Sequence, residues 1–339
     1  MSDLAIVTGG AGFIGSHLVR RLAEAGREVR VIERPGADLG ELPAGVEVRY
    51  SDIRDRRTLA PALRGAAEVY HLAANPNLWA RDRGEFDAVN HVGAVNVLEL
   101  ALESGARRVV HTSTESILTR GDSAGPIDEN VQIHERDAVG PYCLSKLRAE
   151  DAAMGMARRG LPVVVVNPTM PIGPGDRGLS PPSRLILDFC RGKLPVIMDC
   201  TLNLIDVRDV AAGLELAMAR GEPGRRHLLA GENLTLAGLL EILSGICGVP
   251  APRWRVPYAA ALAIAHLSEF RADHLGGGPP RASVTGVRLA RRIMHFDPSQ
   301  SLAVLGLRPR PIRESLADAV NWLVGMGHLA RRLKEGRSG

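Results

Sequence analysis

Thr8-Gly9-Gly10-Ala11-Gly12-Phe13-Ile14-Gly15 stands between a short apolar run, 4–8, and a stretch with apolar side chains at helical spacing, 16–25. Glycines at positions 9, 12 and 15 permit a tight turn, a close backbone approach to a pyrophosphate, and close packing of helix on strand. The first turn of such a helix offers free backbone N–H groups to an anion. The pattern therefore predicts a dinucleotide-binding turn, with cofactor contacts from Gly9, Gly12, Phe13, Ile14 and Gly15.

Strand-like and helix-like stretches alternate through the first half of the chain. Four consecutive valines at 163–166 are typical of a strand that is buried on both faces. This alternation predicts an α/β fold, a Rossmann doubly wound parallel sheet with helices on both faces. After the first strand, the predicted strands are 29–32, 46–50, 68–72, 108–111 and 163–166.

The second half of the chain begins with a different amino-acid composition. The segment 168–182 is dense in proline and glycine, so we expect irregular structure there. Beyond it, apolar periodicity predicts helices at 207–219, 235–247 and 312–323. We therefore expect a dinucleotide-binding domain over 1–168 and a smaller, mostly helical substrate-binding domain over 169–339. Part of 200–230 is expected to return to the large sheet.

The composition of the 339 residues restricts the partners of the chain. It holds 42 Lys and Arg against 38 Asp and Glu, and the basic residues are dispersed apart from a run at 331–337. A nucleic-acid binder usually carries a basic stripe, so we expect a small-molecule substrate and no nucleic-acid partner. The spacing of the four cysteines fits no zinc site, and we expect no metal.

The chain also lacks obvious membrane and export signals. Its start, MSDLAIVTGG, has neither the charged nor the apolar region of a signal peptide. The longest apolar run, near 258–267, is far shorter than the roughly 20 residues that span a bilayer. We therefore expect a cytoplasmic protein without a transmembrane segment. Trp254 and Arg255 flank this run, which fits either a helix resting on a membrane surface or packing in the core or a dimer.

An acidic residue follows the second predicted strand. Glu33 comes eighteen residues after Gly15, where a carboxylate accepts hydrogen bonds from the ribose hydroxyls and repels a 2′-phosphate. This favours NAD over NADP as the cofactor, although the adjacent Arg34 favours the opposite choice. Asp52 and Ile53 follow the third strand and fit the adenine edge.

Tyr142 and Lys146 are four residues apart, which places both side chains on one face of a helix. A nearby ammonium, together with the charge of the cofactor, is expected to lower the pKa of the tyrosine. The phenolate then takes a proton from a substrate hydroxyl while hydride leaves for nicotinamide. A cluster of hydroxyls, Thr112-Ser113-Thr114, follows a strand upstream, and the combination predicts an oxidoreductase site.

This order of motifs resembles the extended short-chain dehydrogenase/reductases of the NAD-dependent epimerase/dehydratase group. The motifs are the glycine turn, His71-Leu72-Ala73-Ala74, Asn90, the hydroxyl cluster and the Tyr142/Lys146 pair. Within that group the chain resembles the hopanoid-associated sugar epimerase-like branch, and the resemblance implies a homodimer formed through two helices. The stretches that carry it are NPNLWARD (75–82), NPTMPIGPGD (167–176), LNLIDVRDVA (202–211), LAGENLTL (229–236) and TGVRLARRIMHFDPSQS (285–301).

The resemblance also implies roles for individual residues. Thr114 corresponds to the third catalytic hydroxyl of the family, with Ser113 as the alternative one residue earlier. Glu115 stands where related dehydratases carry a carboxylic acid, although their second carboxylate is replaced here by Ser116. Glu115 is therefore either an acid that assists the reaction or a hydrogen-bonding carboxylate near the nicotinamide. The residues implied beside the cofactor are Leu72, Ala73, Ala74, Asn90, Thr112, Tyr142, Lys146 and Pro168.

The expected substrate-binding positions give conflicting indications of whether the substrate carries a diphosphate. Asn167 matches an asparagine that contacts the substrate diphosphate in sugar-nucleotide epimerases. Leu202, however, stands where those enzymes usually carry an arginine, and a leucine cannot pair with a diphosphate. Arg177, Arg184 or Arg288 could supply that charge from elsewhere. Asn75 and Trp79 belong to the loop after the fourth strand, near where a substrate enters.

Two enzymatic functions stay open on this basis. The first is an NAD-dependent sugar epimerase or dehydratase, which acts on a sugar nucleotide through a transient ketone. The second is an NAD(P)-dependent dehydrogenase or reductase of a steroid-like, terpenoid or cyclitol hydroxyl, since 168–176 resembles the loop of 3β-hydroxysteroid dehydrogenase-type enzymes. A non-catalytic dinucleotide-binding protein is disfavoured, because such a protein needs no Tyr142/Lys146 pair.

Overall fold

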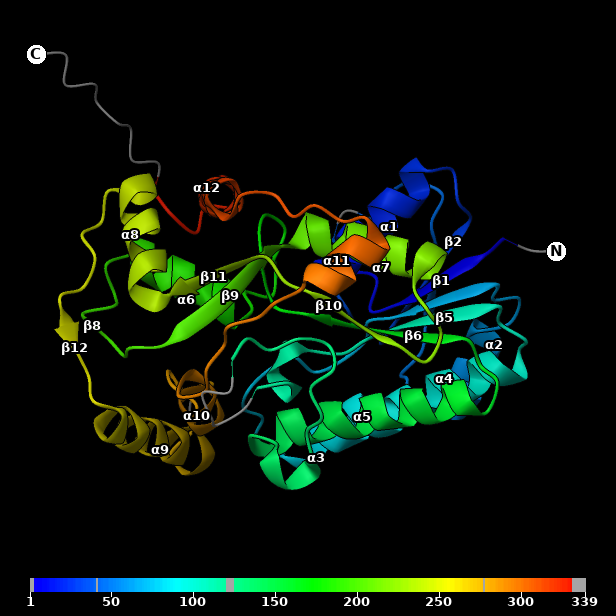
Figure 1. The fold of residues 1–339 in the computed structure, drawn as a ribbon, viewed down its shortest axis with the longest axis horizontal. Coiled ribbons are helices and arrows are strands. Elements are labelled where there is room, and N and C mark those ends of the chain that lie inside the picture. Colours follow the sequence, from blue (N-terminus) through cyan, green and yellow to red (C-terminus); the bar gives the residue numbers. More distant parts are fainter. Residues whose placement is uncertain (1–2, 41, 120–124, 277, 331–339) are drawn as a thin grey trace, which may run out of the picture.

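Seven parallel strands form the large sheet of the computed structural model, which describes residues 3–40, 42–119, 125–276 and 278–330 (Figure 1). The basic run at 331–337 lies outside the described residues. The strand order is β10-β6-β5-β4-β1-β2-β3, and every neighbouring pair is parallel. The strands are β1 (Ala5–Thr8), β2 (Val29–Glu33), β3 (Glu47–Tyr50), β4 (Glu68–His71), β5 (Arg108–Thr112), β6 (Val163–Pro168) and β10 (Arg226–Leu229).

Helices cover both faces of this sheet (Figure 1). The fully buried valines of β6 alternate between the two layers: Val163 and Val165 pack on one side, and Val164 and Val166 on the other. Each such side chain contributes roughly 1.5–3 kcal/mol when it is buried, so one strand stabilises both layers. The predicted Rossmann doubly wound sheet is confirmed. One layer holds α1 (Phe13–Glu24), α7 (Val207–Arg220) and α11 (Ser299–Leu305), and the other holds α2 (Arg56–Ala62), α4 (Gly93–Glu103) and α5 (Gly140–Arg158).

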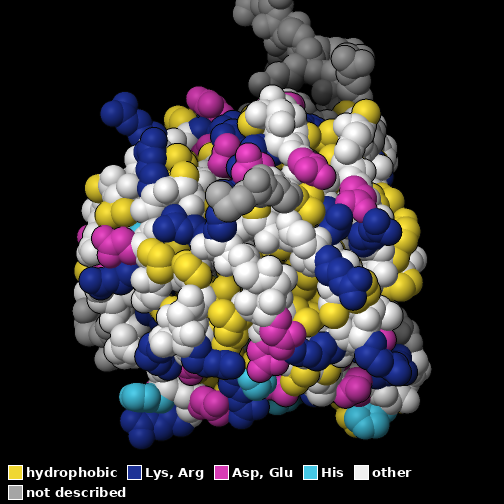
Figure 2. Space-filling view, turned by 90° about the vertical axis from the view of Figure 1, so that its right-hand side faces the viewer, with side chains coloured by type: hydrophobic (Ala, Val, Ile, Leu, Met, Phe, Trp, Pro, Cys, Tyr) yellow, Lys and Arg dark blue, Asp and Glu magenta, His cyan; other side chains and the backbone are white. Residues whose placement is uncertain are grey.

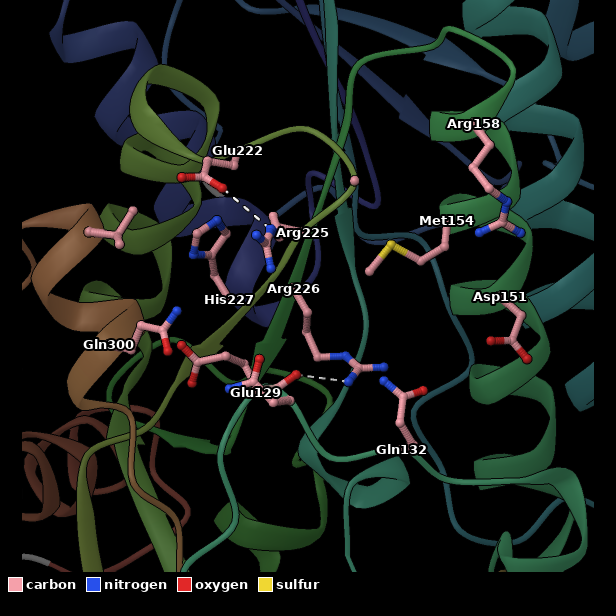
Figure 3. A pocket seen from close by; sticks show the side chains of 13 residues that line it. Glu129, Gln132, Asp151, Met154, Arg158, Glu222, Arg225, Arg226, His227 and Gln300 are labelled. Atoms are coloured by element: carbon pink, nitrogen blue, oxygen red, sulfur yellow. Dashed lines mark hydrogen bonds and ion pairs between the residues drawn. The ribbon is translucent and has the colours of Figure 1, made fainter.

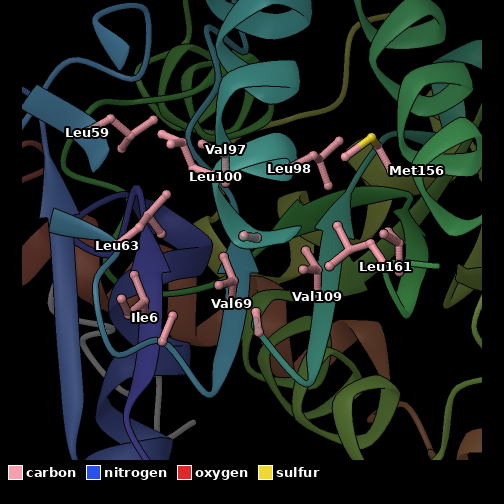
Figure 4. Close-up of a cluster of buried hydrophobic side chains, with 14 of the residues drawn as sticks. Ile6, Leu59, Leu63, Val69, Val97, Leu98, Leu100, Val109, Met156 and Leu161 are labelled. Atoms are coloured by element: carbon pink, nitrogen blue, oxygen red, sulfur yellow. The ribbon is translucent and has the colours of Figure 1, made fainter. Parts of the chain in front are cut away.

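The layer with α4 and α5 has the cluster of apolar side chains drawn in Figure 4. Val97 and Leu98 of α4 and Met156 of α5 meet Val69 and Val109 of the sheet there. This packing fixes α5, the helix of Tyr142 and Lys146, against the sheet.

The strand order reverses at β1, because β2 and β3 follow on one side of it and β4, β5 and β6 on the other. Ligands of open α/β sheets bind outside the carboxyl ends of the strands at such a reversal. Thr8, His71, Thr112 and Pro168 end four of these strands at the same edge. The fold therefore brings the predicted motifs to one edge of the sheet.

The rest of the chain forms two small sheets and several helices. α6, α8 and α12 pack around β9 in a separate apolar cluster, and α9 and α10 lie beside each other at the lower left of Figure 1. The small sheets are β11-β9-β7 and β12-β8. The elements are β7 (Met170–Ile172), α6 (Pro181–Cys190), β8 (Val196–Ile197), β9 (Thr201–Asp206), β11 (Glu232–Thr235), α8 (Leu236–Cys247), β12 (Trp254–Arg255), α9 (Tyr258–His274), α10 (Val284–Ala290) and α12 (Ile312–Gly325). Within the described residues there are also four short helical turns: α3 (Gly84–Phe86), η1 (Asp87–Val92), η2 (Glu115–Ile117) and η3 (Glu135–Asp137).

The expectation of irregular structure throughout 168–182 is wrong. Met170–Ile172 forms strand β7, and α6 begins at Pro181. Proline is tolerated in both places, because β7 lies at the edge of its sheet and because the first turn of a helix needs no N–H from the ring.

Two segments from the second half of the chain join the large sheet. β10 pairs in parallel with β6, and α7 packs on the same face as α1. The division of the chain at residue 168 stays a prediction. Among the helices of the described ranges, none has the length and apolar character needed to cross a membrane.

Candidate active site

The glycine turn after β1 has the close approaches that its sequence predicts. A Cβ at Gly15 would lie 2.1 Å from the carbonyl oxygen of Gly9, so no larger residue fits there. Gly9 has a φ of +72°, and a Cβ on it would lie 2.8 Å from the Ala73 nitrogen. Gly12 is the residue before α1. The backbone N–H groups of Phe13 and Ile14 therefore belong to the first helical turn, where N–H groups make no bonds within the helix. The turn can therefore hold a pyrophosphate at the helix N-terminus.

Glu33 ends β2 and faces this turn. Its Oε1 accepts a hydrogen bond from the Ala11 N–H at 2.8 Å. Burial raises the pKa of Glu33, while the Ala11 N–H and the charge of Arg34 act in the opposite direction. Arg34 itself is exposed. The turn thus holds a carboxylate where ribose hydroxyls are expected.

Asp52 and Ile53 both make contacts within the protein. Asp52 accepts bonds from the backbone and guanidinium of Arg54, which lower the pKa of its carboxyl. Ile53 is buried beneath Gly93, where a Cβ would lie 2.6 Å from its Cδ1. A contact of either residue with adenine stays a prediction.

The loop after β4 is held by Asn90, which lies in the π-helical turn η1. The backbone N–H of Asn75 donates to Asn90 Oδ1 at 2.7 Å, and Asn90 Nδ2 donates to Ser145 Oγ at 3.0 Å. Ser145 in turn donates to the Tyr142 carbonyl oxygen. Asn90 therefore ties the loop that carries Leu72, Ala73 and Ala74 to the helix of the catalytic pair. Ser145 was missed from the sequence because a serine three residues after a tyrosine carries no distinctive signal.

Tyr142 and Lys146 are both buried on α5. Lys146 Nζ donates to the Thr112 carbonyl oxygen at 2.8 Å, at the end of β5. Burial lowers the pKa of Lys146 to about 8, and the charge of Glu150 opposes this shift. The ammonium is thereby fixed beneath the carboxyl ends of the strands.

The expected lowering of the Tyr142 pKa is not found in the protein alone. Burial raises the pKa of Tyr142 above its usual value, and the charge of Glu115 raises it further. A hydrogen bond with Thr114 acts in the opposite direction but does not outweigh the burial. The phenol is therefore the resting form of this side chain.

Thr114 and Glu115 form a buried pair next to that phenol. Thr114 Oγ1 donates to Glu115 Oε2 at 2.8 Å, and burial raises the pKa of Glu115. Within the described part of the chain, the hydroxyls of Thr112 and Ser113 have no hydrogen-bond partner. Because Thr114 interacts with Tyr142, it fits the third catalytic hydroxyl better than Ser113 does.

Asn167 lies in the interior rather than at an open surface. Its Nδ2 donates to Glu150 Oε2 at 2.8 Å and to the Thr114 carbonyl oxygen at 3.1 Å, and its side chain is fully buried. Glu150 also pairs with Arg226 of β10. This placement contrasts with the predicted contact to a substrate diphosphate. Glu150 was not predicted, although its position four residues after Lys146 on the same helix face is a usable signal.

The other predicted substrate residues also have partners. Trp79 Nε1 donates to Asp273 Oδ1 of α9 at 3.1 Å. Arg177 lies beside the loop after β2, where its Nη1 is 3.4 Å from Asp38 Oδ2. Asn75 Oδ1 accepts from the Asn77 N–H. The substrate roles of Trp79, Arg177 and Asn75 stay predictions.

A cavity of about 440 Å³ lies at the other edge of the sheet, beside β10 (Figure 3). Its charged walls include Glu222 paired with Arg225, while Arg226 donates to the Glu129 carbonyl oxygen. None of the predicted catalytic or cofactor residues lines it. We therefore place the active site at the carboxyl ends of the strands and not in this cavity.

A doubly wound sheet with a glycine turn and a buried Tyr-x-x-x-Lys helix defines a dinucleotide-dependent oxidoreductase of the short-chain dehydrogenase/reductase type. Residues 5–231 match the NAD dependent epimerase/dehydratase family, and the chain belongs to this family.

Similar proteins carry names from reductase and sterol chemistry. The chain is 37% identical over 336 residues to a Synechocystis sp. protein named, provisionally, as a dihydroflavonol 4-reductase, with 97% of each chain covered. It is 34% identical over 319 residues to sterol demethylase protein B of Methylococcus capsulatus, covering 94% of this chain and 97% of that protein.

Solved structures share the fold over nearly the whole chain. The crystal structure of gox2253 has a TM-score of 0.85 at 34% identity, covering 97% of this chain and 100% of the other. MoeE5, solved with UDP-glucuronic acid and NAD, has a TM-score of 0.73 at 26% identity, covering 95% and 99%.

Proposed function

We propose that this chain is an NAD-dependent dehydrogenase or ketoreductase that acts on a hydroxyl, or the matching ketone, of an apolar polycyclic or isoprenoid molecule. The observation that carries the proposal concerns the two positions expected to bind a diphosphate. Leu202 is buried in the apolar cluster of β9, α6, α8 and α12, and the Asn167 amide is bonded to Glu150 in the interior. The relatives named for dihydroflavonol and sterol chemistry support the same substrate class.

The three arginines that could replace the missing charge are not held in a buried cation site. Arg177 is held by Asp38, and Arg184 and Arg288 are exposed on α6 and α10. A doubly charged ligand needs fixed cations, because an exposed and unrestrained arginine contributes little. An uncharged substrate fits these positions better.

NAD fits the residues at the carboxyl ends of β1 and β2. Gly15 leaves room where any Cβ would meet the Gly9 carbonyl, and Glu33 presents its carboxylate at the turn, where it accepts from the Ala11 N–H. A 2′-phosphate would be repelled there. When bound, NAD supplies the nicotinamide ring that accepts or returns hydride.

The proton is handled by Tyr142 with Thr114 and Lys146. In oxidation, the substrate O–H proton passes to the phenolate oxygen of Tyr142 as hydride leaves the carbon. In reduction, the phenol returns that proton to the ketone oxygen while Thr114 holds the same oxygen. The raised pKa of Tyr142 keeps the phenol protonated near neutral pH, which suits reduction. The Lys146 ammonium stabilises the phenolate when it forms.

A self-contained epimerase or dehydratase is the second candidate. The buried Glu115, bonded to Thr114, is an extra acid–base group beside the reacting oxygen. Such an enzyme keeps its cofactor, because the same hydride returns to the intermediate ketone.

One measurement separates the two candidates. The freshly purified protein is denatured, and any released dinucleotide is identified by mass and compared with the protein concentration. An empty protein that reversibly binds added NAD, and that reduces it when given steroid or isoprenoid alcohols, supports the dehydrogenase. Near-stoichiometric bound NAD, with no net reduction by these alcohols, contradicts it and favours the epimerase or dehydratase.

A further inference from the structure

Helix α9 and the preceding strand β12 expose a row of large apolar side chains. Ile264, Leu267 and Phe270 follow one another at helical spacing, with Trp254 before them and Leu275 after them, and each is between 53% and 76% exposed. The opposite side of α9 is buried through Ala265 and Ala272. Single exposed apolar residues are ordinary, but three large ones on successive turns of one helix face mark a candidate interaction surface.

The acidic and basic residues of the stretch 251–295 differ in number and in exposure. The only acidic residues in the sequence 251–295 are Glu269 and Asp273. Both turn inward, because Arg83 Nη2 lies 3.1 Å from Asp273 Oδ2 and 3.4 Å from Glu269 Oε2. The two carboxylates of this stretch are therefore neutralised on the inner side of α9.

Seven arginines fall in the same sequence stretch, and six of them are exposed. Arg255 lies 3.2 Å from Asp199, and Arg291 lies over the ring of Tyr258 at 4.7 Å. The rest of the chain holds 35 basic and 36 acidic residues, so this stretch accounts for the net positive charge of the sequence. At the far end of the molecule, by contrast, Lys and Arg are interspersed with Asp and Glu (Figure 2).

We infer that α9 and Trp254 form a docking surface for an anionic lipid bilayer. A helix with an apolar ridge and surrounding arginines lies in the plane of such a surface, with its apolar face about 5–10 Å into the boundary of headgroups and acyl chains. Arginines near an anionic leaflet add attraction to the lipid phosphates. The exposed apolar side chains and the excess of exposed arginines over acidic residues in 251–295 both match this occupant.

The inner side of α9 connects the docking surface to the candidate active site. Trp79 and Arg83, on the loop that follows β4, bond to Asp273, and Arg81 Nη2 donates to the Ala272 carbonyl oxygen. The same loop begins with Ala73, Ala74 and Asn75 beside the glycine turn. If the proposed function holds, docking of α9 would bring the loop beside the candidate active site close to the bilayer that contains an apolar substrate.

The test is flotation of the full chain with vesicles, which needs no substrate. Vesicles of phosphatidylcholine alone are compared with vesicles in which part of the lipid is phosphatidylglycerol. We expect binding to the anionic vesicles only, with a blue shift of tryptophan fluorescence that Trp254→Phe removes. Failure of the wild-type protein to float with anionic vesicles would overturn the inference, whatever its catalytic activity.

Matched variants separate the docking surface from general effects. The double change Leu267→Glu, Phe270→Glu is expected to lower the partition coefficient about tenfold or more, since two apolar groups leave the bilayer and two like charges face it. Tyr50→Glu, which alters an equally exposed apolar residue on β3, should leave binding unchanged. Thermal melting and NAD binding check that both variants fold.

The molecular mass of the protein in solution tests the alternative that a second copy of the chain, and not a bilayer, covers the apolar row. If the double variant is a monomer where the wild-type protein is a dimer, and wild-type vesicle binding is absent, the row is an interface between two copies and the inference is wrong. An unchanged mass with lost flotation supports the bilayer.

Discussion

The Asn167 amide donates to the Glu150 carboxylate over 2.8 Å, and this contact joins β6 to the helix of the catalytic pair. Arg226 pairs with the other oxygen of Glu150, so a strand from the second half of the chain completes the group. Asn167 and Glu150 are buried, and the Arg226 side chain is 14% exposed beside the cavity of Figure 3, so the carboxylate lies where an unpaired charge is costly.

Removal of Glu150 should therefore destabilise the protein strongly. Glu150→Ala removes the carboxylate to which Arg226 and Asn167 both donate and leaves them only backbone carbonyl partners, so we expect a loss of about 1.5–3 kcal/mol in the free energy of unfolding. Denaturant titration followed by circular dichroism measures this. Glu222→Ala is the control, because its ion pair with Arg225 is exposed and such pairs contribute about 0–1 kcal/mol. Equal losses in the two variants would contradict a structural role for the buried group.

Because Lys146 is buried, the free energy of unfolding should change with pH in the alkaline range. Its pKa falls from 10.5 to about 8 on folding, so between these values the unfolded chain binds more protons than the folded one. The free energy of unfolding should therefore gain a contribution of up to roughly 3 kcal/mol from this group as pH rises through that window. Lys146→Met should lack that contribution. Parallel pH curves for the wild-type protein and Lys146→Met would show that the pKa is not lowered.

The glycine turn should tolerate no side chain at its third glycine. Gly15→Ala places a Cβ against the Gly9 carbonyl, so we expect the loss of NAD binding by titration calorimetry and a lower melting temperature. Gly245→Ala is the matched control, because a Cβ on this helical glycine would make only an ordinary contact, at 3.8 Å from Arg313 Nη2. That change should retain binding and add about 0.5–1 kcal/mol of stability. NAD binding by Gly15→Ala at wild-type affinity would remove the turn from the cofactor site.

The choice between NAD and NADP should depend on Glu33. Glu33→Ser removes the carboxylate that repels a 2′-phosphate and leaves Arg34 beside the site. We expect the ratio of the Kd for NADP to the Kd for NAD to fall at least about tenfold, since a lost charge repulsion of this size amounts to about 1.4 kcal/mol. Arg34→Ala in the same background should reverse the gain. An unchanged ratio in Glu33→Ser would mean that the ribose lies elsewhere.

The large sheet and the common helix of Tyr142 and Lys146 could be predicted from the sequence, because their signals are local. The valine run, the glycine turn and the spacing of Tyr142 and Lys146 each lie within a few residues. The group of Asn167, Glu150 and Arg226 could not be assembled this way, since its members are 17 and 76 residues apart.

The pKa of Tyr142 in the protein without its cofactor differs from the predicted direction for a related reason. The i, i+4 spacing correctly placed an ammonium on the same helix face, but it gave no measure of burial. Burial and the adjacent Glu115 dominate the pKa in the folded protein. The proline-rich β7 was missed because its partner strand, β9, is more than thirty residues away.

The proposed proton transfer makes a strict demand on Tyr142. Tyr142→Phe keeps the ring that contacts Phe86 but removes the only hydroxyl assigned to carry the proton. We expect kcat to fall by a factor of about 10² or more, the usual contribution of a positioned acid–base group, with the Kd for NAD unchanged. Glu115→Gln should cost much less if the enzyme is a net dehydrogenase, because its carboxyl has no assigned proton to move. A large loss of kcat in Glu115→Gln, with NAD still bound, would instead assign that carboxyl to the chemistry and favour the epimerase or dehydratase.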